Sequence, residues 1–158
     1  MKRWAEKLMA RRVPDFVIGG AENPYLRRWW IIPRNRFFNI YLHEIIRSDD
    51  DRALHDHPWI NLSILIDGGY FEHTIAAGGI HRRIWRGAGA WKFRLPGAAH
   101  RLELAMGSAV EMRAISLFIT GPNVRSWGFH CPEAGWVHWR DFTAGDHGEI
   151  VGRGCGEP

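Results

Sequence analysis

The sequence is poor in cysteine and has no long apolar run. Two cysteines occur among its 158 residues, and because Cys131 lies in an expected turn and Cys155 in a glycine-rich tail, we do not expect a disulfide framework. No apolar stretch approaches the ~20 residues that a membrane-spanning helix requires. The start of the chain also lacks the apolar core of a signal peptide. We therefore expect a cytoplasmic protein with no membrane partner.

The chain also lacks a concentrated block of charge. Its formal net charge is +4, from 21 lysines and arginines against 17 acidic residues, and the arginines are spread along the whole length. A nucleic-acid-binding protein more often gathers its basic residues on one helix or arm. We therefore expect no nucleic-acid partner.

Aromatic residues, by contrast, are abundant. The nine tryptophans and eight phenylalanines suit the pleated, half-buried surfaces of β-strands. Short strand-like runs alternate with glycine-containing turns such as Asp67-Gly68-Gly69 and Pro96-Gly97. We expect strands at 29–32, 37–46, 59–66, 70–75, 81–85, 90–95, 100–105, 110–120 and 124–129. This pattern predicts an all-β sandwich or barrel.

One domain accounts for the whole length, since 158 residues fall within the usual size of a single domain. We expect that domain over residues 1–150, with a β-barrel at 28–140 and a flexible tail at 151–158. Residues 1–13 are typical of a short basic helix that ends before Pro14 and packs against the barrel.

Alternation along the expected strand at 59–66 places Leu62, Ile64 and Ile66 on one face. If Asn61 faces the interior, this apolar row faces outward and must be covered. Either a second copy of the chain or the N-terminal segment can cover it, so a homodimer is one expectation.

Three histidines carry the strongest chemical signal. His55 and His57 are two residues apart, so an extended backbone directs both imidazoles to the same side. His100 follows a turn and can begin a neighbouring strand about 5 Å away, which is close enough to complete a metal site. Imidazole favours Fe, Zn, Cu and Ni over Mg and Ca. The three histidines therefore predict a site for one transition-metal ion.

The segment around these residues resembles the first motif of the cupin superfamily. That motif is His-x-His, then three or four residues, Glu, six residues and Gly. His55, His57 and Gly68 stand at the matching positions, and Asn61 stands where the family has its glutamate.

A second segment resembles the other cupin motif, Pro-x-Gly-x-x-His-x-x-x-Asn. Gly97 and His100 have the family spacing, although Pro96 directly precedes the glycine and Leu104 replaces the asparagine. The likeness covers roughly residues 50–104. It implies a double-stranded β-helix, the cupin jelly-roll barrel, with a metal inside.

Loss of the family glutamate makes the chain more similar to the three-histidine subset of cupins, such as the thiol dioxygenases. Asn61 could ligate the metal through its carbonyl oxygen or orient a bound water. A cupin barrel that has lost its metal and keeps the histidines as core residues would also lack that glutamate. Both interpretations remain open at the level of sequence.

Other polar residues are candidates for roles near the metal. Tyr41 and His43 share one face of an expected strand and could donate protons to a bound oxygen species, or simply pack together. Arg94 and Arg113 could bind a substrate carboxylate, or lie on the surface.

The remaining polar segments have structural interpretations. Asp56 is expected to form a loop salt bridge with Arg52, and the run Asp49-Asp50-Asp51 a solvated turn. The segment around His130 is expected to be a buried turn that caps the barrel.

Three functions follow from these features. The first is a metal-dependent enzyme, an Fe(II) oxygenase acting on a small polar molecule, with Zn(II) or Ni(II) as alternative metals. The second is an isomerase or epimerase of the cupin kind, either without metal or with zinc. The third is a non-catalytic module that binds a ligand or a protein. The fold analogy supports an enzyme by association only.

Overall fold

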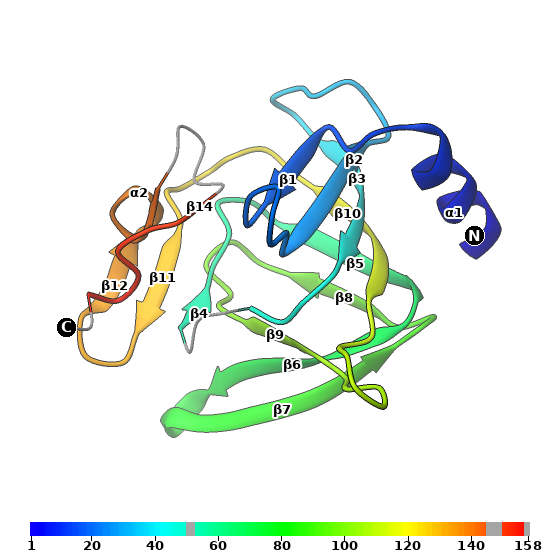
Figure 1. The fold of residues 1–158 in the computed structure, drawn as a ribbon. Helices are drawn as coiled ribbons and strands as arrows, with labels where there is room; N and C mark the ends of the chain where they lie inside the picture. Colours follow the sequence, from blue (N-terminus) through cyan, green and yellow to red (C-terminus); the bar gives the residue numbers. More distant parts are fainter. Residues whose placement is uncertain (50–52, 145–149, 157–158) are drawn as a thin grey trace.

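Strands make up most of the regular structure in the computed structural model, which describes residues 1–49, 53–144 and 150–156 (Figure 1). In chain order the elements are α1 (Lys2–Arg11), β1 (Phe16–Ile18), β2 (Leu26–Trp30), β3 (Asn39–Ile45), β4 (Leu54–His55), β5 (Asn61–Asp67), β6 (Gly69–Ala76), the short 3-10 helix η1 (Ala77–Gly79), β7 (Ile80–Gly87), β8 (Trp91–Arg94), β9 (Arg101–Leu104), β10 (Ala114–Thr120), β11 (Gly128–Cys131), β12 (Gly135–His138), α2 (Trp139–Phe142), β13 (Thr143–Ala144) and β14 (Ile150–Val151).

Two antiparallel sheets form the barrel. One has the strand order β1-β2-β3-β10-β5-β8, and the other has the order β7-β6-β9. A core cluster joins them, because Leu26, Ile45 and Leu65 of the first sheet are buried with Tyr70 and Leu104 of the second. The predicted all-β, double-stranded β-helix architecture with a short N-terminal helix is confirmed.

Gly68 makes the sharp passage from β5 into β6. Its φ is +68°, and a Cβ there would lie 2.2 Å from the backbone oxygen of Arg113. Any larger residue would clash with the backbone of the neighbouring segment, so glycine is required. This is the glycine that matches the first cupin motif.

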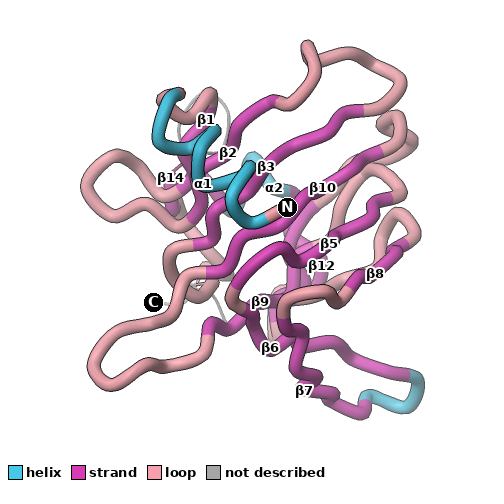
Figure 2. The backbone as a smooth tube through the Cα atoms, turned by 90° about the vertical axis from the view of Figure 1, so that its right-hand side faces the viewer, coloured by secondary structure: helices cyan, strands magenta, loops and turns pink. Residues whose placement is uncertain are grey.

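Helix α1 covers part of the outer face of the larger sheet (Figure 2). Ala5 is fully buried and packs in one cluster with Trp29 and Ile66. The N-terminal segment therefore covers one end of the predicted apolar row. On β8 the row continues into Trp91 and Phe93, which are exposed. A homodimer through this face stays a prediction.

A small C-terminal cap closes one side of the barrel. Its sheet has the order β12-β11-β4, so β4 of the barrel region belongs to the cap sheet. Phe129 stacks on Phe142 of α2 with ring centroids 3.6 Å apart. A disulfide joins Cys131 of β11 to Cys155, which corrects our expectation that no disulfide forms. The fold brings together two segments that the sequence assigned to a separate turn and tail.

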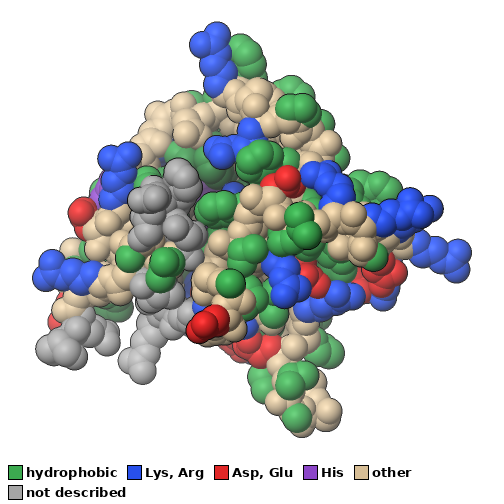
Figure 3. Space-filling view, turned by 45° about the horizontal axis from the view of Figure 1, so that its top comes forward, with side chains coloured by type: hydrophobic (Ala, Val, Ile, Leu, Met, Phe, Trp, Pro, Cys, Tyr) green, Lys and Arg blue, Asp and Glu red, His purple; other side chains and the backbone are tan. Residues whose placement is uncertain are grey.

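Charged side chains are spread over the surface. On the face shown in Figure 3, lysines and arginines project at several separate places, with acidic residues between some of them. Among the described residues no helix is long and apolar enough to cross a membrane.

Candidate metal centre

His55, His57 and His100 converge at one point between the barrel and the cap. One ligand nitrogen from each ring lies within 4.8 Å of the corresponding atoms of the other two. His55 and His100 are held together by two backbone hydrogen bonds of 2.8 and 2.9 Å, and His57 follows His55 by two residues. The structure thus brings together the three histidines that the spacing selected.

The nitrogens in this cluster fit a metal ion. The Nε2 atoms of His57 and His100 are 3.1 Å apart. Two imidazoles on one ion, each with a metal–nitrogen bond of about 2.0–2.1 Å, place their nitrogens roughly 3 Å apart. The donor set and its spacing therefore suit a transition-metal ion.

Two of these rings, those of His55 and His100, each have a carboxylate on their Nδ1 side. Asp49 Oδ2 is 3.7 Å from Nδ1 of His55, and Glu72 Oε1 is 3.5 Å from Nδ1 of His100. Neither contact is a hydrogen bond in this structure; each carboxylate lies on the Nδ1 side of its ring, the position from which carboxylates orient metal-binding imidazoles and leave Nε2 for the metal. Asp49 also accepts a hydrogen bond of 2.7 Å from the Leu102 amide, so it does not lie in a solvated turn. Its neighbours in the acidic run, residues 50 and 51, lie outside the described residues.

Burial keeps the three imidazoles neutral. Desolvation lowers the pKa of His55, takes the pKa of His57 well below its usual range, and brings the pKa of His100 to about 3. The positive charge of Arg94 acts in the same direction at all three. Because a metal binds the neutral imidazole, the ligands need lose no proton at neutral pH.

Glu72 is the residue that sequence reasoning missed. It is buried on the inward face of β6 beside Tyr70, and it binds the equally buried Arg94 as well as Arg86 at 3.0 Å. A glutamate in register with a buried tyrosine was a possible signal, since alternate residues of a strand share a face.

Three further candidate site residues have partners within the protein. Asn61 is buried, but its Oδ1 accepts a hydrogen bond of 3.3 Å from Arg94, so the structure does not support it as a metal ligand. Arg94 is 3% exposed and is occupied by Glu72, so it is not available to a substrate carboxylate. Arg113 pairs at 2.7 Å with Glu44 on the outer face, which agrees with the surface position that the sequence also allowed.

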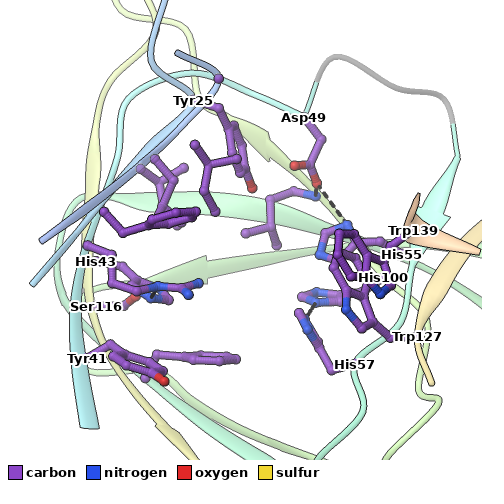
Figure 4. A pocket seen from close by; sticks show the side chains of 18 of the residues that line it. Tyr25, Tyr41, His43, Asp49, His55, His57, His100, Ser116, Trp127 and Trp139 are labelled. Atoms are coloured by element: carbon purple, nitrogen blue, oxygen red, sulfur yellow. Dashed lines mark hydrogen bonds and ion pairs between the residues drawn. The ribbon is translucent and has the colours of Figure 1, made fainter. Parts of the chain in front are cut away.

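A cavity of about 670 Å³ opens beside the histidines. Figure 4 shows the three rings on one side and Tyr41, His43 and Ser116 on the other. Most of the cavity wall is apolar or aromatic. Beside the histidines this wall includes Trp127 and Trp139 of the cap, whose rings stack at 5.8 Å.

Tyr41 and His43 line the cavity as expected, but across it from the metal site. Their rings stack at 5.9 Å, and Nε2 of His43 accepts a hydrogen bond of 2.9 Å from Arg28. Burial, aided by the charge of Arg28, takes the pKa of His43 well below its usual range. The ring is therefore neutral with Nε2 occupied, and its stacking on Tyr41 agrees with the packed aromatic pair that the sequence also allowed; a proton-donating role for either residue stays a prediction.

Asp56 connects the metal-binding segment to the cap. It is fully buried and accepts hydrogen bonds from the Gly128 amide, Arg125, His130 and Trp136. Burial acts to raise its pKa, but these donors outweigh burial and lower it. We expected a loop salt bridge with Arg52, which lies outside the described residues. The residue between His55 and His57 therefore fixes their segment to β11 and β12.

No protein-family model and no curated protein matches the sequence, whereas solved structures match the fold. The crystal structure of Fe(II) HppE is 14% identical with a TM-score of 0.51, over 69% of this chain and 58% of that chain. A putative mannose-6-phosphate isomerase from Ralstonia eutropha is 15% identical with a TM-score of 0.51, over 68% and 93% of the two chains. An RmlC-like cupin from Shewanella frigidimarina is 17% identical with a TM-score of 0.49, over 70% and 83%. At these identities the likeness concerns the fold: the chain has the double-stranded β-helix fold of the cupin superfamily.

Proposed function

We propose that the protein is a metal-dependent enzyme that holds one divalent ion, Fe(II), through His55, His57 and His100 and oxygenates a small polar molecule. The observation that supports this most directly is the convergence of three neutral imidazoles at the wall of a cavity. A structural neighbour with a TM-score of 0.51, HppE, is described as containing Fe(II). Zn(II) and Ni(II) suit the same nitrogen donors.

Bound at this site, the ion would supply a Lewis acid with coordination positions open to substrate and dioxygen. The residues of the chain supply orientation and exclusion of water. Asp49 and Glu72 lie on the Nδ1 side of two of the imidazoles and would orient these rings, and the stacked Trp127 and Trp139 cover the site from the cap. Three neutral ligands leave the charge of the ion unbalanced, which favours an anionic substrate group.

The second candidate is an isomerase that uses a histidine as base. The Glu72–His100 pair supplies the carboxylate-oriented histidine that such a mechanism needs. Burial, however, brings the pKa of His100 to about 3, too low for an effective general base near neutral pH. The pair therefore fits a ligand and the carboxylate that orients it better than it fits a catalytic base.

Metal content tests the proposal. We would measure metals in the purified, tag-free protein and titrate it anaerobically with Fe(II), Zn(II) and Ni(II). We expect near-stoichiometric binding by the wild type and by His81→Ala, because His81 is exposed on β7. His57→Ala and His100→Ala should each lose the ion.

Oxygen uptake with small thiols and acids would then test the reaction. Uptake that requires both Fe(II) and His57 supports the oxygenase. If the wild type binds none of the three metals, the proposed metal centre is wrong. If it binds Zn(II) or Ni(II) but not Fe(II), the site stands and the oxygenase does not.

A further inference from the structure

Arg28 is a cation within the cavity wall without an acidic partner. It lies on β2, and its Nε donates to the neutral ring of His43, while its guanidinium carbon lies 4.7 Å from the centroid of the Tyr41 ring. Among the described residues no carboxylate forms an ion pair with Arg28, and neither Nη group has a hydrogen-bond partner. The guanidinium edge that can bind an oxyanion in bidentate fashion is therefore unoccupied.

Arg27, the residue before Arg28 on β2, does have an acidic partner, so among the described residues the lack of one is specific to the cavity side of this strand. Arg27 points to the opposite face of the same strand and pairs with Glu44 at 3.2 Å. The surface arginine thus has a carboxylate, whereas the cavity arginine has a histidine. An unpaired charge removed from water is costly unless a counter-charge reaches it.

The acidic residues of the cavity wall are already occupied. Asp15 pairs with Arg12 at 3.0 Å and accepts a hydrogen bond from the Trp30 amide. Asp49 lies 3.7 Å from Nδ1 of His55 and accepts a hydrogen bond from the Leu102 amide. Burial lowers the pKa of Arg28 to about 10, which leaves the guanidinium charged at neutral pH. The cavity therefore holds a positive group that no described acid of its own wall neutralises.

The positions of the two polar ends suggest the shape of a ligand. Arg28 contacts His43, which Figure 4 places across the cavity from the three histidines. Aromatic rings line the space between them, including Phe118, which stacks on His43 at 5.0 Å. An apolar body can occupy this space while an acidic group reaches the guanidinium.

We propose that Arg28 is the anion-binding residue of the cavity and that the substrate is a small organic acid with an apolar body. Its carboxylate, phosphate or other oxyanion binds the two Nη groups, and its opposite end lies at the three histidines. His43 is a positioning residue, because its Nε2 holds Arg28 Nε and so directs the free edge into the cavity. Assignment of the opposite end rests on the proposed metal function, whereas the anion site does not.

Binding of simple aromatic acids tests this proposal. We would titrate benzoate, phenylacetate and 3-phenylpropionate, each beside its uncharged amide, by calorimetry into metal-free and into Zn(II)-loaded protein. In the wild type we expect at least one acid to bind about tenfold more tightly than its amide. Arg28→Gln should remove this preference, and Arg28→Lys should retain part of it because it keeps the charge but loses the planar fork.

Arg27→Gln is the matched control on the same strand and should leave the preference for acids intact. Circular dichroism and metal content report whether each variant is folded. If no acid binds better than its amide, or if folded Arg28→Gln keeps the wild-type preference, the anion site is wrong. If the acid preference depends on Arg28 but no metal binds, the anion site stands and the metal-dependent function fails.

Discussion

Replacing Glu72 by glutamine removes one charge from a buried network with little change of shape. Glu72 and Arg94 have side chains only 1% and 2% exposed, and Arg86 also binds this carboxylate. Burial acts to raise the pKa of Glu72, but His100 and Arg94 together hold it well below its usual range. Since the His100 contact is 3.5 Å long, we attribute most of this effect to Arg94.

The expected loss of stability follows from the charge that remains. Glu72→Gln leaves Arg94 buried without its counter-charge, which typically costs about 3–5 kcal/mol. For a protein of 158 residues this corresponds to a melting temperature roughly 6–20 °C lower. The ring of His100 also loses its carboxylate, so we expect metal affinity to fall by about 10- to 100-fold.

Thermal unfolding at pH 7 and metal titration measure the two effects separately. Glu22→Gln, at an exposed position between β1 and β2, is the control for loss of one carboxylate. In the double variant Glu72→Leu, Arg94→Met the unpaired charge is gone, so stability should recover in part relative to Glu72→Gln. A melting temperature of Glu72→Gln equal to that of the wild type would refute the reasoning.

Three further predictions concern stability. The double variant Cys131→Ser, Cys155→Ser should lose about 3 kcal/mol of the free energy of unfolding, because the disulfide closes a loop of 24 residues in the unfolded chain. Urea unfolding measures this loss. Equal urea midpoints for the double variant and the oxidised wild type would contradict the prediction. Glu103 has its pKa lowered to about 2 by hydrogen bonds from Arg83, so the stability it contributes is present above its ordinary value of 4.5 and is lost as the pH falls toward 2. The stability difference between wild type and Glu103→Gln should therefore shrink over that pH range, and a difference independent of pH would disprove the assignment. Ala5→Asp places a charge in a fully buried position and should lower the free energy of unfolding by more than ~3 kcal/mol, unless α1 does not pack on the sheet in solution.

The sequence was informative where the signal is local. Strand periodicity and turn glycines predicted the all-β fold, and the two-residue spacing of His55 and His57 predicted that their rings converge. Gly68 was also identified from a motif, and its φ of +68° is a local requirement of the connection between β5 and β6. Each of these features depends on residues near one another in the chain or on a spacing set by backbone geometry.

The features that sequence reasoning missed depend on contacts between distant segments. Arg94 lies 22 residues from Glu72, and Arg125 lies 69 residues from Asp56. Nothing in a local pattern says which buried arginine meets which acid. For the same reason Arg28 could not be distinguished from Arg27: only the fold directs one into the cavity and the other to Glu44.

The pairing of β4 with β11 makes the cap part of the proposed metal centre. His55 lies opposite Phe129 in that pairing, so a proposed metal ligand belongs to the same sheet as the C-terminal segment. If an ion binds His55 only when β4 is paired with β11, its binding free energy also stabilises the ordered cap against local unfolding. Metal addition should therefore slow amide hydrogen exchange at 128–131, many residues from the ligands in sequence. Residues 128–131 would then report whether the centre is filled.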